Sequence, residues 1–142
     1  MAKMLVLQGC PASGKSTFAR KFVEGQSDKW IITNRDSIRR MFGEYWIPSR
    51  ETLVKDSEYS IILLALSSGF NVVVDDSNLN PKAISDLKII ANKTKAEIEF
   101  KRFDVPLDEL LKRDKNRENP VGEEVIQNFY KKYYTNVSNK SN

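Results

Sequence analysis

The nine residues of the stretch GCPASGKST, from Gly9 onward, supply the groups that a phosphate-binding loop needs. The fixed positions of the pattern G-x-x-x-x-G-K-[ST] are filled by Gly9, Gly14, Lys15 and Ser16. In such a loop, successive backbone N–H groups and a helix N-terminus form a concave anion site, which glycine lets the backbone wrap. The lysine reaches the β- and γ-phosphates, and Ser16 supplies an oxygen to Mg²⁺. We therefore expect this loop to bind a nucleoside triphosphate with magnesium.

The remaining residues of the loop are expected to surround the same phosphates; they are Cys10, Pro11, Ala12, Ser13 and Thr17. An apolar run precedes the loop and a helical pattern follows it, which is the strand–loop–helix context that the motif requires. The alternative, a glycine-rich turn that binds nothing, does not account for this context. We interpret Cys10 as a small loop filler, with a redox role as the alternative.

Four apolar, β-favouring runs alternate with longer helical stretches and span 4–7, 30–33, 71–74 and 97–103. Strand–helix alternation predicts a parallel sheet with helices on both faces. Within residues 50–68, the core SIILLALSS is apolar on nearly every face, so we expect a buried helix that ends at Gly69 rather than a strand. Asn80-Pro81, Pro106 and Glu123 mark the starts of three further helices. The predicted fold is α/β, a P-loop NTPase-type three-layer fold with a four-stranded parallel sheet and a small helical lid.

The composition fits one compact domain. The chain has 142 residues, of which 40% are hydrophobic and 30% charged, and its net charge of +4 permits an anionic partner without demonstrating one. Because there is no histidine, a general base must be a carboxylate, lysine, tyrosine or cysteine. We expect a P-loop domain at 1–134, with a lid at about 112–121, and a polar tail at 135–142.

The same counts bear on where the protein works. A single cysteine rules out an internal disulfide and favours a reducing compartment. No apolar run reaches the ~18 residues of a membrane span, and the apolar part of MAKMLVLQG is too short for a signal peptide. We expect a cytoplasmic protein, in the host cytoplasm if the chain is encoded by a phage. The oligomeric state stays open.

Charged residues follow the second and third predicted strands. In an open parallel sheet, ligands bind at the carboxyl ends of the strands. Asp36 and Arg39 come just after the second strand, three residues apart on a starting helix, so they share a face. Asp75 and Asp76 end the third strand, where a carboxylate usually supports the magnesium site. Periodicity does not decide which of the two points inward, and Asp36 has the alternative interpretation of a helix N-cap.

The segment LLKRDKNRENPVG, after Pro106, carries two arginines four residues apart, Arg113 and Arg117. On a helix both would lie on one face. A short, arginine-bearing helix followed by ENP suggests a mobile lid that adds positive charge at the γ-phosphate. The alternative is a solvated helix of mixed charge, because Asp114 and Glu118 lie among the cations.

Taken together, these motifs resemble a known family. GCPASGKST, NRDSIRRM, DDSNLNP, FDVPLDELLKRDKNR and NPVGEEVIQNFYKKY are similar, in the same order and spacing, to the 5′-kinase domain of bacteriophage polynucleotide kinase. The P-loop is shared by thousands of enzymes, whereas R-D-x-x-R and D-S-N-L-N-P are much more specific. The resemblance implies transfer of the γ-phosphate of ATP to the 5′-hydroxyl of DNA or RNA, with Mg²⁺.

The resemblance also implies roles for individual residues. Lys15 and Ser16 would bind phosphates and metal, and Asp36 would be the general base. Arg39 would contact the 3′-phosphate of the terminal nucleotide. Asp76, with Ser77 after it, would help to orient the acceptor. Arg117 would act on the transferring phosphate, and Arg113 would be a second lid arginine of less defined role.

Two features depart from the family. The D-x-D-G-T motif of the 3′-phosphatase domain that often follows the kinase is absent, which leaves a stand-alone kinase or a truncated chain. The segment MFGEYWIPSR, residues 41–50, differs most. Its Tyr45 and Trp46 have two interpretations, stacking on a nucleobase or packing against the lid, and we favour the second.

Two other functions compete with a polynucleotide kinase. A small-molecule P-loop kinase, with a nucleoside, antibiotic or sugar as acceptor, would also place an aspartate after the second strand. A binding or ATP-hydrolysing module has no need for an acceptor site such as Asp36 with Arg39. The preference for DNA or RNA, the acceptor length and the nucleotide donor are left open by the sequence.

Overall fold

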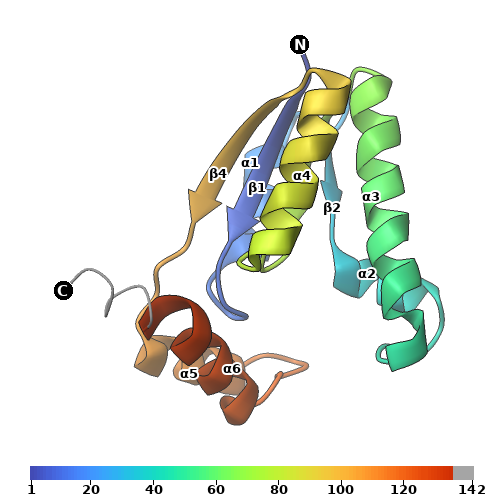
Figure 1. Ribbon diagram of the computed structural model, residues 1–142. Coiled ribbons are helices and arrows are strands. Elements are labelled where there is room, and N and C mark those ends of the chain that lie inside the picture. The colour runs from blue at the N-terminus through green and yellow to red at the C-terminus, as the bar shows by residue number, and fades with distance from the viewer. Residues whose placement is uncertain (136–142) are drawn as a thin grey trace.

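The four predicted strands form one parallel sheet in the computed structural model, which describes residues 1–135. The strands are β1 (Lys3–Gln8), β2 (Trp30–Thr33), β3 (Asn71–Asp75) and β4 (Glu97–Arg102). Their order across the sheet is β2-β3-β1-β4, and every neighbouring pair is parallel. The predicted α/β fold with a four-stranded parallel sheet is therefore confirmed (Figure 1).

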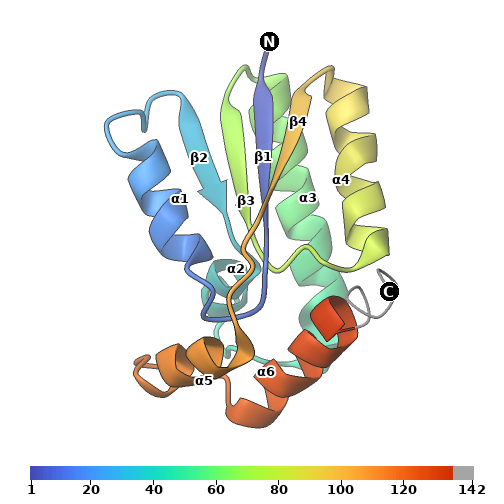
Figure 2. The same ribbon diagram turned by 90° about the vertical axis from the view of Figure 1, so that its left-hand side faces the viewer.

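Helices cover both faces of the sheet, and a second group lies beyond the carboxyl ends of its strands (Figures 1 and 2). The covering helices are α1 (Lys15–Val23) on one face and α3 (Glu51–Ser67) with α4 (Pro81–Thr94) on the other. The second group comprises α2 (Arg35–Met41), η1 (Pro48–Arg50), α5 (Leu107–Lys115), α6 (Glu123–Tyr130) and the π-helical turn η2 (Lys131–Thr135). The second group therefore lies at the carboxyl ends of the strands, where open parallel sheets bind their ligands.

The core has two layers because side chains alternate across a strand. Met4 and Val6 of β1 pack with α3 and α4, whereas Leu5 and Leu7 pack toward α1. In β3, Val73 joins the α1 layer, and its neighbours on both sides join the opposite one. All three of these β3 valines are fully buried, so the core fixes the strand end at Asp75, which Asp76 directly follows.

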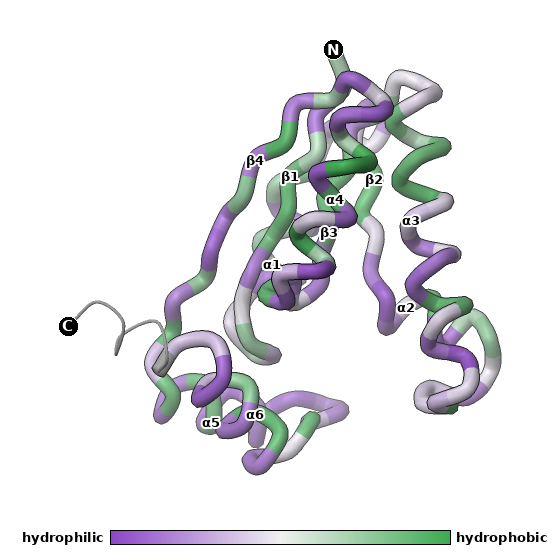
Figure 3. Tube along the Cα trace, viewed as in Figure 1, coloured by the Kyte–Doolittle hydropathy of each residue, from purple (hydrophilic) through white to green (hydrophobic). Residues whose placement is uncertain are grey.

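The long helix α3 is less buried than its composition indicates. The predicted helix and its glycine stop are present, and Gly69 has the positive φ of +89° that ends a helix without strain. The prediction of a buried helix is wrong for part of its surface: within the apolar core of the helix, Leu63 and Leu64 are 41% and 69% exposed. Only one stripe of α3, which includes Ile62 and Leu66, reaches the sheet, because a helix presents one face to a flat layer. Figure 3 shows the hydrophobic stretch continuing around its upper turns.

Within residues 1–135, no helix is long and apolar enough to cross a membrane.

Asn80 caps α4 as predicted, because its side chain accepts a 2.8 Å hydrogen bond from the backbone N–H of Lys82. The helix α5 begins at Leu107, one position later than predicted, so Pro106 is its N-cap rather than its first helical residue. The polar tail predicted at 135–142 lies, from residue 136 on, outside the described residues.

Candidate active site

The loop between β1 and α1 has the backbone shape of a phosphate cradle. Gly14, the N-cap of α1, has φ of +98°, and no side chain caps the helix, so its first N–H groups are open to an anion. A Cβ on Gly9 would lie 2.7 Å from Ser13 Oγ and 3.1 Å from Phe103 Cβ. Only glycine therefore fits at either position, as the sequence pattern predicts.

Lys15 lies over this loop and is 9% exposed. Its Nζ donates hydrogen bonds of 2.9 and 2.8 Å to the carbonyl oxygens of Gly9 and Cys10, and one of 3.3 Å to Ser13 Oγ. Burial lowers the pKa of Lys15 to about 8, although the carboxylate of Asp75 acts in the opposite direction. A buried ammonium that is held only by neutral oxygens is poised to bind an anion that offers it full charge.

Ser16 is linked to the end of β3. Its Oγ donates a 2.7 Å hydrogen bond to Asp75 Oδ2, and Asp75 Oδ1 is buried without a partner among residues 1–135. No cluster of three or more metal-ligating Cys, Asp or Glu side chains occurs in the same range. A serine hydroxyl beside one unsatisfied carboxylate fits Mg²⁺, which keeps several waters and takes phosphate oxygens as further ligands. Of the two aspartates left open by periodicity, Asp75 is the one that faces the loop.

Asn34 connects this phosphate site to α2. Its Nδ2 donates a 2.7 Å hydrogen bond to the backbone oxygen of Asp75, and its Oδ1 accepts a 3.0 Å bond from the backbone N–H of Ser37. Asn34 is therefore the N-cap of α2, and the alternative interpretation of Asp36 as that cap is wrong. Asp36 lies in the first turn, with a side chain that is 38% exposed.

The predicted pair at the start of α2 is in direct contact. Arg39 Nη1 donates a 2.6 Å hydrogen bond to Asp36 Oδ1, which also accepts a 2.9 Å bond from the phenol of Tyr45. Glu51, at the start of α3, accepts from Arg39 Nε at 2.9 Å and from Nη2 at 2.6 Å. The hydrogen bonds to Glu51 have the largest effect, and together with the bond to Asp36 they raise the pKa of Arg39. The guanidinium therefore stays charged. Among residues 1–135, Asp36 Oδ2 has no hydrogen-bond partner, and it lies beside the cation of Arg39.

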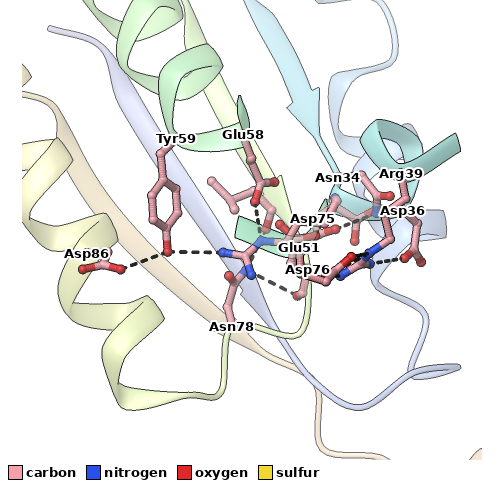
Figure 4. A network of polar contacts seen from close by, with 12 residues as sticks. Asn34, Asp36, Arg39, Glu51, Glu58, Tyr59, Asp75, Asp76, Asn78 and Asp86 are labelled. Atoms are coloured by element: carbon pink, nitrogen blue, oxygen red, sulfur yellow. Dashed lines mark hydrogen bonds and ion pairs between the residues drawn. The ribbon is translucent and has the colours of Figure 1, made fainter. Parts of the chain in front are cut away.

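Asp76 belongs to a different network, on the side of the sheet that α3 and α4 cover (Figure 4). Its Oδ1 accepts a 2.8 Å bond from the backbone N–H of Arg35. Burial, and then Glu58, raises the pKa of Asp76 well above its ordinary range. The Arg35 guanidinium donates to Glu58 Oε1 at 3.1 Å and to the Tyr59 hydroxyl at 3.2 Å. This network fixes the start of α2 against α3.

Ser77 and Asn78 tie the loop after β3 to the phosphate loop. The backbone oxygen of Ser77 accepts a 3.0 Å bond from the N–H of Gly9. Asn78 donates a 2.8 Å bond to the backbone oxygen of Leu7, in the adjacent strand. The motif D-S-N-L-N-P thus has a structural task beside the P-loop, and Ser77 meets the loop through its backbone.

The helices α5 and α6, which the predicted lid at about 112–121 connects, share a small core formed by Cys10, Leu110 and Ile126. Cys10 thus packs the P-loop against these two helices, and burial raises the pKa of its thiol. The Arg113 Nη1 lies 3.8 Å from the Cβ position built on Gly14, at the mouth of the loop. The prediction that Arg113 and Arg117 share a helical face is wrong, because α5 ends at Lys115.

Arg117 lies in the turn after α5, where Asp114 organises the chain. Asp114 is 3% exposed and accepts 3.0 Å hydrogen bonds from the backbone N–H groups of Val121 and Gly122. Its Oδ1 also lies 3.5 Å from Arg117 Nη1. The charge of Arg117 is one of the influences that lower the pKa of Lys15, so both cations act at the same loop.

Sequence reasoning did not identify four residues that position the site: Asn34, Glu51, Glu58 and Asp114. The Asn34 cap had a usable signal, since asparagine directly precedes a helical pattern in NRDSIRRM. Glu51 and Glu58 lie in a different helix from the arginines that they bind, so spacing along the chain carries no information about either pair. Asp114 lies among cations in the sequence, which leaves a solvated mixed-charge helix as one of two interpretations, and only the turn that folds back onto Asp114 shows its role.

The fold and this site define a P-loop kinase domain. A family model described as an AAA domain, AAA_33, matches residues 4–135, and the chain belongs to this family. The chain is 36% identical over 135 residues to the L-seryl-tRNA(Sec) kinase of Methanococcus maripaludis, a match that covers 93% of this chain and 52% of that protein.

Two other matches are a polynucleotide kinase/RNA ligase and a chain of an RNA repair complex. The chain is 31% identical over 148 residues to a protein of Autographa californica nuclear polyhedrosis virus described as a bifunctional polynucleotide kinase/RNA ligase, covering 92% of this chain and 21% of that protein. A chain in the structure of the Pnkp1/Rnl/Hen1 RNA repair complex superposes with a TM-score of 0.84 at 30% identity, over 97% of this chain and 46% of that chain. This chain thus spans about half the length, or less, of these relatives.

Proposed function

We propose that this chain is a polynucleotide 5′-kinase domain that transfers the γ-phosphate of ATP to the 5′-hydroxyl end of DNA or RNA. The observation that carries the proposal is the 2.6 Å contact between Asp36 and Arg39, which lie three residues apart on α2, the helix that Asn34 caps and joins to Asp75. A carboxylate with an anion-binding cation at its side suits a hydroxyl whose own sugar carries a phosphate. The polynucleotide kinase relative and the RNA repair structure support the same assignment.

In the proposed reaction, the 5′-oxygen attacks the γ-phosphorus while its proton passes to Asp36, and the bond from that phosphorus to the β-phosphate oxygen breaks. Oδ1 of Asp36 is anchored by Arg39 and Tyr45, so Oδ2 is the oxygen that takes the proton. Mg²⁺ would supply charge neutralisation at the phosphates when bound at Ser16 and Asp75. Lys15 and the lid arginines would hold the γ-phosphate in line with the attacking hydroxyl.

Arg39 retains hydrogen-bonding capacity for the acceptor. A guanidinium has five N–H donors, and the hydrogen bonds to Glu51 and Asp36 engage one on each nitrogen. Each terminal nitrogen therefore keeps one N–H, and two such donors suit a bidentate contact with phosphate oxygens. Glu51 orients the guanidinium, because its two oxygens lie within 3.2 Å of Nε and Nη2.

A second candidate is a kinase for the seryl group of an aminoacylated tRNA. It is favoured by one observation, the 36% identity over 93% of this chain to the L-seryl-tRNA(Sec) kinase. The same base and phosphate loop would serve, because a seryl hydroxyl is also a primary alcohol. In this case Arg39 would bind a phosphate of the tRNA rather than one on the reacting sugar.

The deciding experiment is a panel of acceptors with γ-labelled ATP and Mg²⁺. The panel contains a 5′-hydroxyl oligonucleotide, a nucleoside, the nucleoside 3′-phosphate, seryl-tRNA and simple sugars. The proposal expects label on the oligonucleotide and on the nucleoside 3′-phosphate, with a much weaker reaction of the nucleoside. Label on seryl-tRNA alone establishes the second candidate, and label on a sugar or nucleoside alone establishes a small-molecule kinase.

The role of Arg39 is tested in the same assay. Arg39→Ala is expected to raise KM for the nucleoside 3′-phosphate by about 10- to 100-fold, the cost of a lost charge-assisted contact, and to leave KM for ATP unchanged. The matched control is Lys21→Ala, an exposed cation on α1. An equal loss with the nucleoside and with its 3′-phosphate contradicts the phosphate contact.

A further inference from the structure

The segment between α2 and η1 brings two aromatic side chains back over α2. The guanidinium carbon of Arg39 lies 5.4 Å from the ring centroid of Trp46, and that of Arg40 lies 5.2 Å from the ring of Tyr45. Within residues 1–135, the core shared by α5 and α6 contains neither aromatic residue. The interpretation that Tyr45 and Trp46 pack against the lid is therefore wrong, and both belong to the acceptor side of the site.

The two aromatic residues contact different groups: Tyr45 binds the carboxylate of Asp36, and Trp46 lies against the guanidinium of Arg39. The Tyr45 hydroxyl is bound to Asp36 Oδ1, and burial together with this bond raises the pKa of the phenol. Trp46 is 58% exposed although it is a large apolar side chain. Arg39 lies over the indole, and more than half of the Trp46 surface stays accessible beside this contact.

We propose that Trp46 is the platform on which the first nucleobase of the acceptor strand stacks. This rests on the proposed function, in which Arg39 binds the 3′-phosphate of the terminal nucleotide. The base and the 3′-phosphate of a nucleotide are joined through a single sugar, so a phosphate on Arg39 brings the base close to the ring that Arg39 covers. The attacking 5′-hydroxyl of the same sugar then meets Asp36, which Tyr45 holds.

The chemistry of an indole also fits what this enzyme would need. Every base has a π-face, so stacking on an aromatic ring accepts any terminal base and adds affinity without reading sequence. A cation over one face of the ring strengthens such a site, because Arg39 interacts with the ring and with the phosphate at once. Trp46 is thereby assigned as an acceptor-binding residue that discriminates a nucleotide end from a simple alcohol.

Binding is tested by fluorescence in a Trp30→Phe background. The chain has two tryptophans, and Trp30 packs edge-on against Phe22 in the α1 layer, so this variant leaves Trp46 as the only indole. A 5′-hydroxyl oligonucleotide is expected to quench the Trp46 emission. The same oligonucleotide with an abasic residue at its first position is expected to leave the emission nearly unchanged. Equal quenching by both overturns the proposal.

Kinetics give a second readout with oligonucleotides that carry or lack the first base. The wild-type protein is expected to prefer the intact end by about 5- to 100-fold in kcat/KM, the usual effect of one base–aromatic stack. Trp46→Ala is expected to abolish this preference, and Trp46→Phe to keep most of it. The control is Leu64→Ala, which removes an exposed side chain from α3, away from the site.

These outcomes separate the two proposals. If the oligonucleotides are phosphorylated but the first base makes no difference, or Trp46→Ala keeps the preference, the stacking platform is wrong and the kinase assignment stands. If no oligonucleotide is phosphorylated or bound, both proposals fail.

Discussion

Ser16 Oγ and Asp75 Oδ2 are 2.7 Å apart, and this hydrogen bond joins the first turn of α1 to the carboxyl end of β3. Asn34 extends the connection to α2 by donating to the backbone oxygen of Asp75. The phosphate loop and the proposed acceptor side of the site are thus held to one another through a single strand end. Asp75 and Asp76, adjacent in the chain, consequently serve two different sides.

Asn substitutions at the two aspartates should separate these sides. Asp75→Asn is expected to raise the Mg²⁺ concentration for half-maximal rate by about 10- to 100-fold, the typical cost of removing a group that supports a metal ligand. Asp76→Asn should leave the Mg²⁺ requirement unchanged and raise KM for the acceptor, because Asp76 contacts the backbone of α2. A magnesium titration of both variants checks this, and a common shift in both would contradict it.

The pH dependence of nucleotide binding should follow Lys15. Burial lowers its pKa from the ordinary 10.5 to about 8, and bound phosphates favour the charged form, so binding above pH 8 takes up a proton. Without Mg²⁺, in EDTA, ATP affinity should fall as pH rises from 8, by at most about tenfold per unit. Calorimetry in two buffers of different ionisation enthalpy measures the proton uptake. Lys15→Met should abolish the pH dependence, and persistence of the same slope would exclude Lys15 as its source.

Whereas ATP affinity should fall as pH rises, the stability of the ligand-free protein should rise with pH. Between the folded pKa of about 8 and the ordinary value of 10.5, the unfolded chain binds more protons at Lys15 than the folded chain. The contribution of Lys15 to the free energy of unfolding therefore rises with pH across this window. Comparing denaturant unfolding of the wild-type protein and Lys15→Met at pH 8 and pH 10 isolates this contribution.

Asp36→Asn should greatly slow phosphoryl transfer and leave the fold intact. Asparagine keeps an oxygen for Arg39 and Tyr45 but cannot take a proton, so kcat is expected to fall by about 10²- to 10⁴-fold. The melting temperature should barely change, because Asn34 is the cap of α2. The matched variant Asn34→Ala should instead lower the free energy of unfolding by about 0.5–2 kcal/mol. Near-normal turnover in Asp36→Asn would remove Asp36 from the role of base.

The lid should act through Arg117 on the transition state. Arg117→Ala is expected to lower kcat strongly with a modest change in KM for ATP, because its charge is needed most as the phosphoryl group moves. Arg117→Lys should not restore the rate if the contact is bidentate, since lysine lacks the planar fork. Steady-state kinetics of both variants decide this, and a fully active lysine variant would contradict it.

Asp114→Asn tests the support of that arginine. The carboxylate accepts from two backbone N–H groups, one at each oxygen, whereas an amide has a single oxygen to offer. The variant is expected to lose about 1–3 kcal/mol of stability and part of its kcat. Glu118→Ala, in the same turn, is the control and should change neither quantity.

The amino-acid sequence by itself determined the features that local pattern encodes. The P-loop, the four strands, the glycine stop after α3 and the Asn80 cap each depend on residues within a few positions of one another. Their physical causes are local too: backbone conformations that only glycine adopts easily, the shape of a cap, and the clustering of β-favouring residues. The family-specific motifs R-D-x-x-R and D-S-N-L-N-P predict an acceptor site at the ends of the second and third strands.

The tertiary structure alone decided which groups meet. Val72, Val73 and Val74 are alike in sequence and buried on both faces, so nothing local tells which face of β3 lies against α1. Packing puts Val73 in the α1 layer, and Asp75, two residues on, faces Ser16 while Asp76 turns toward Glu58. The same holds for Arg39 with Glu51 and for the indole beside it, because these contacts depend on how separate elements pack, and spacing along the chain does not encode that.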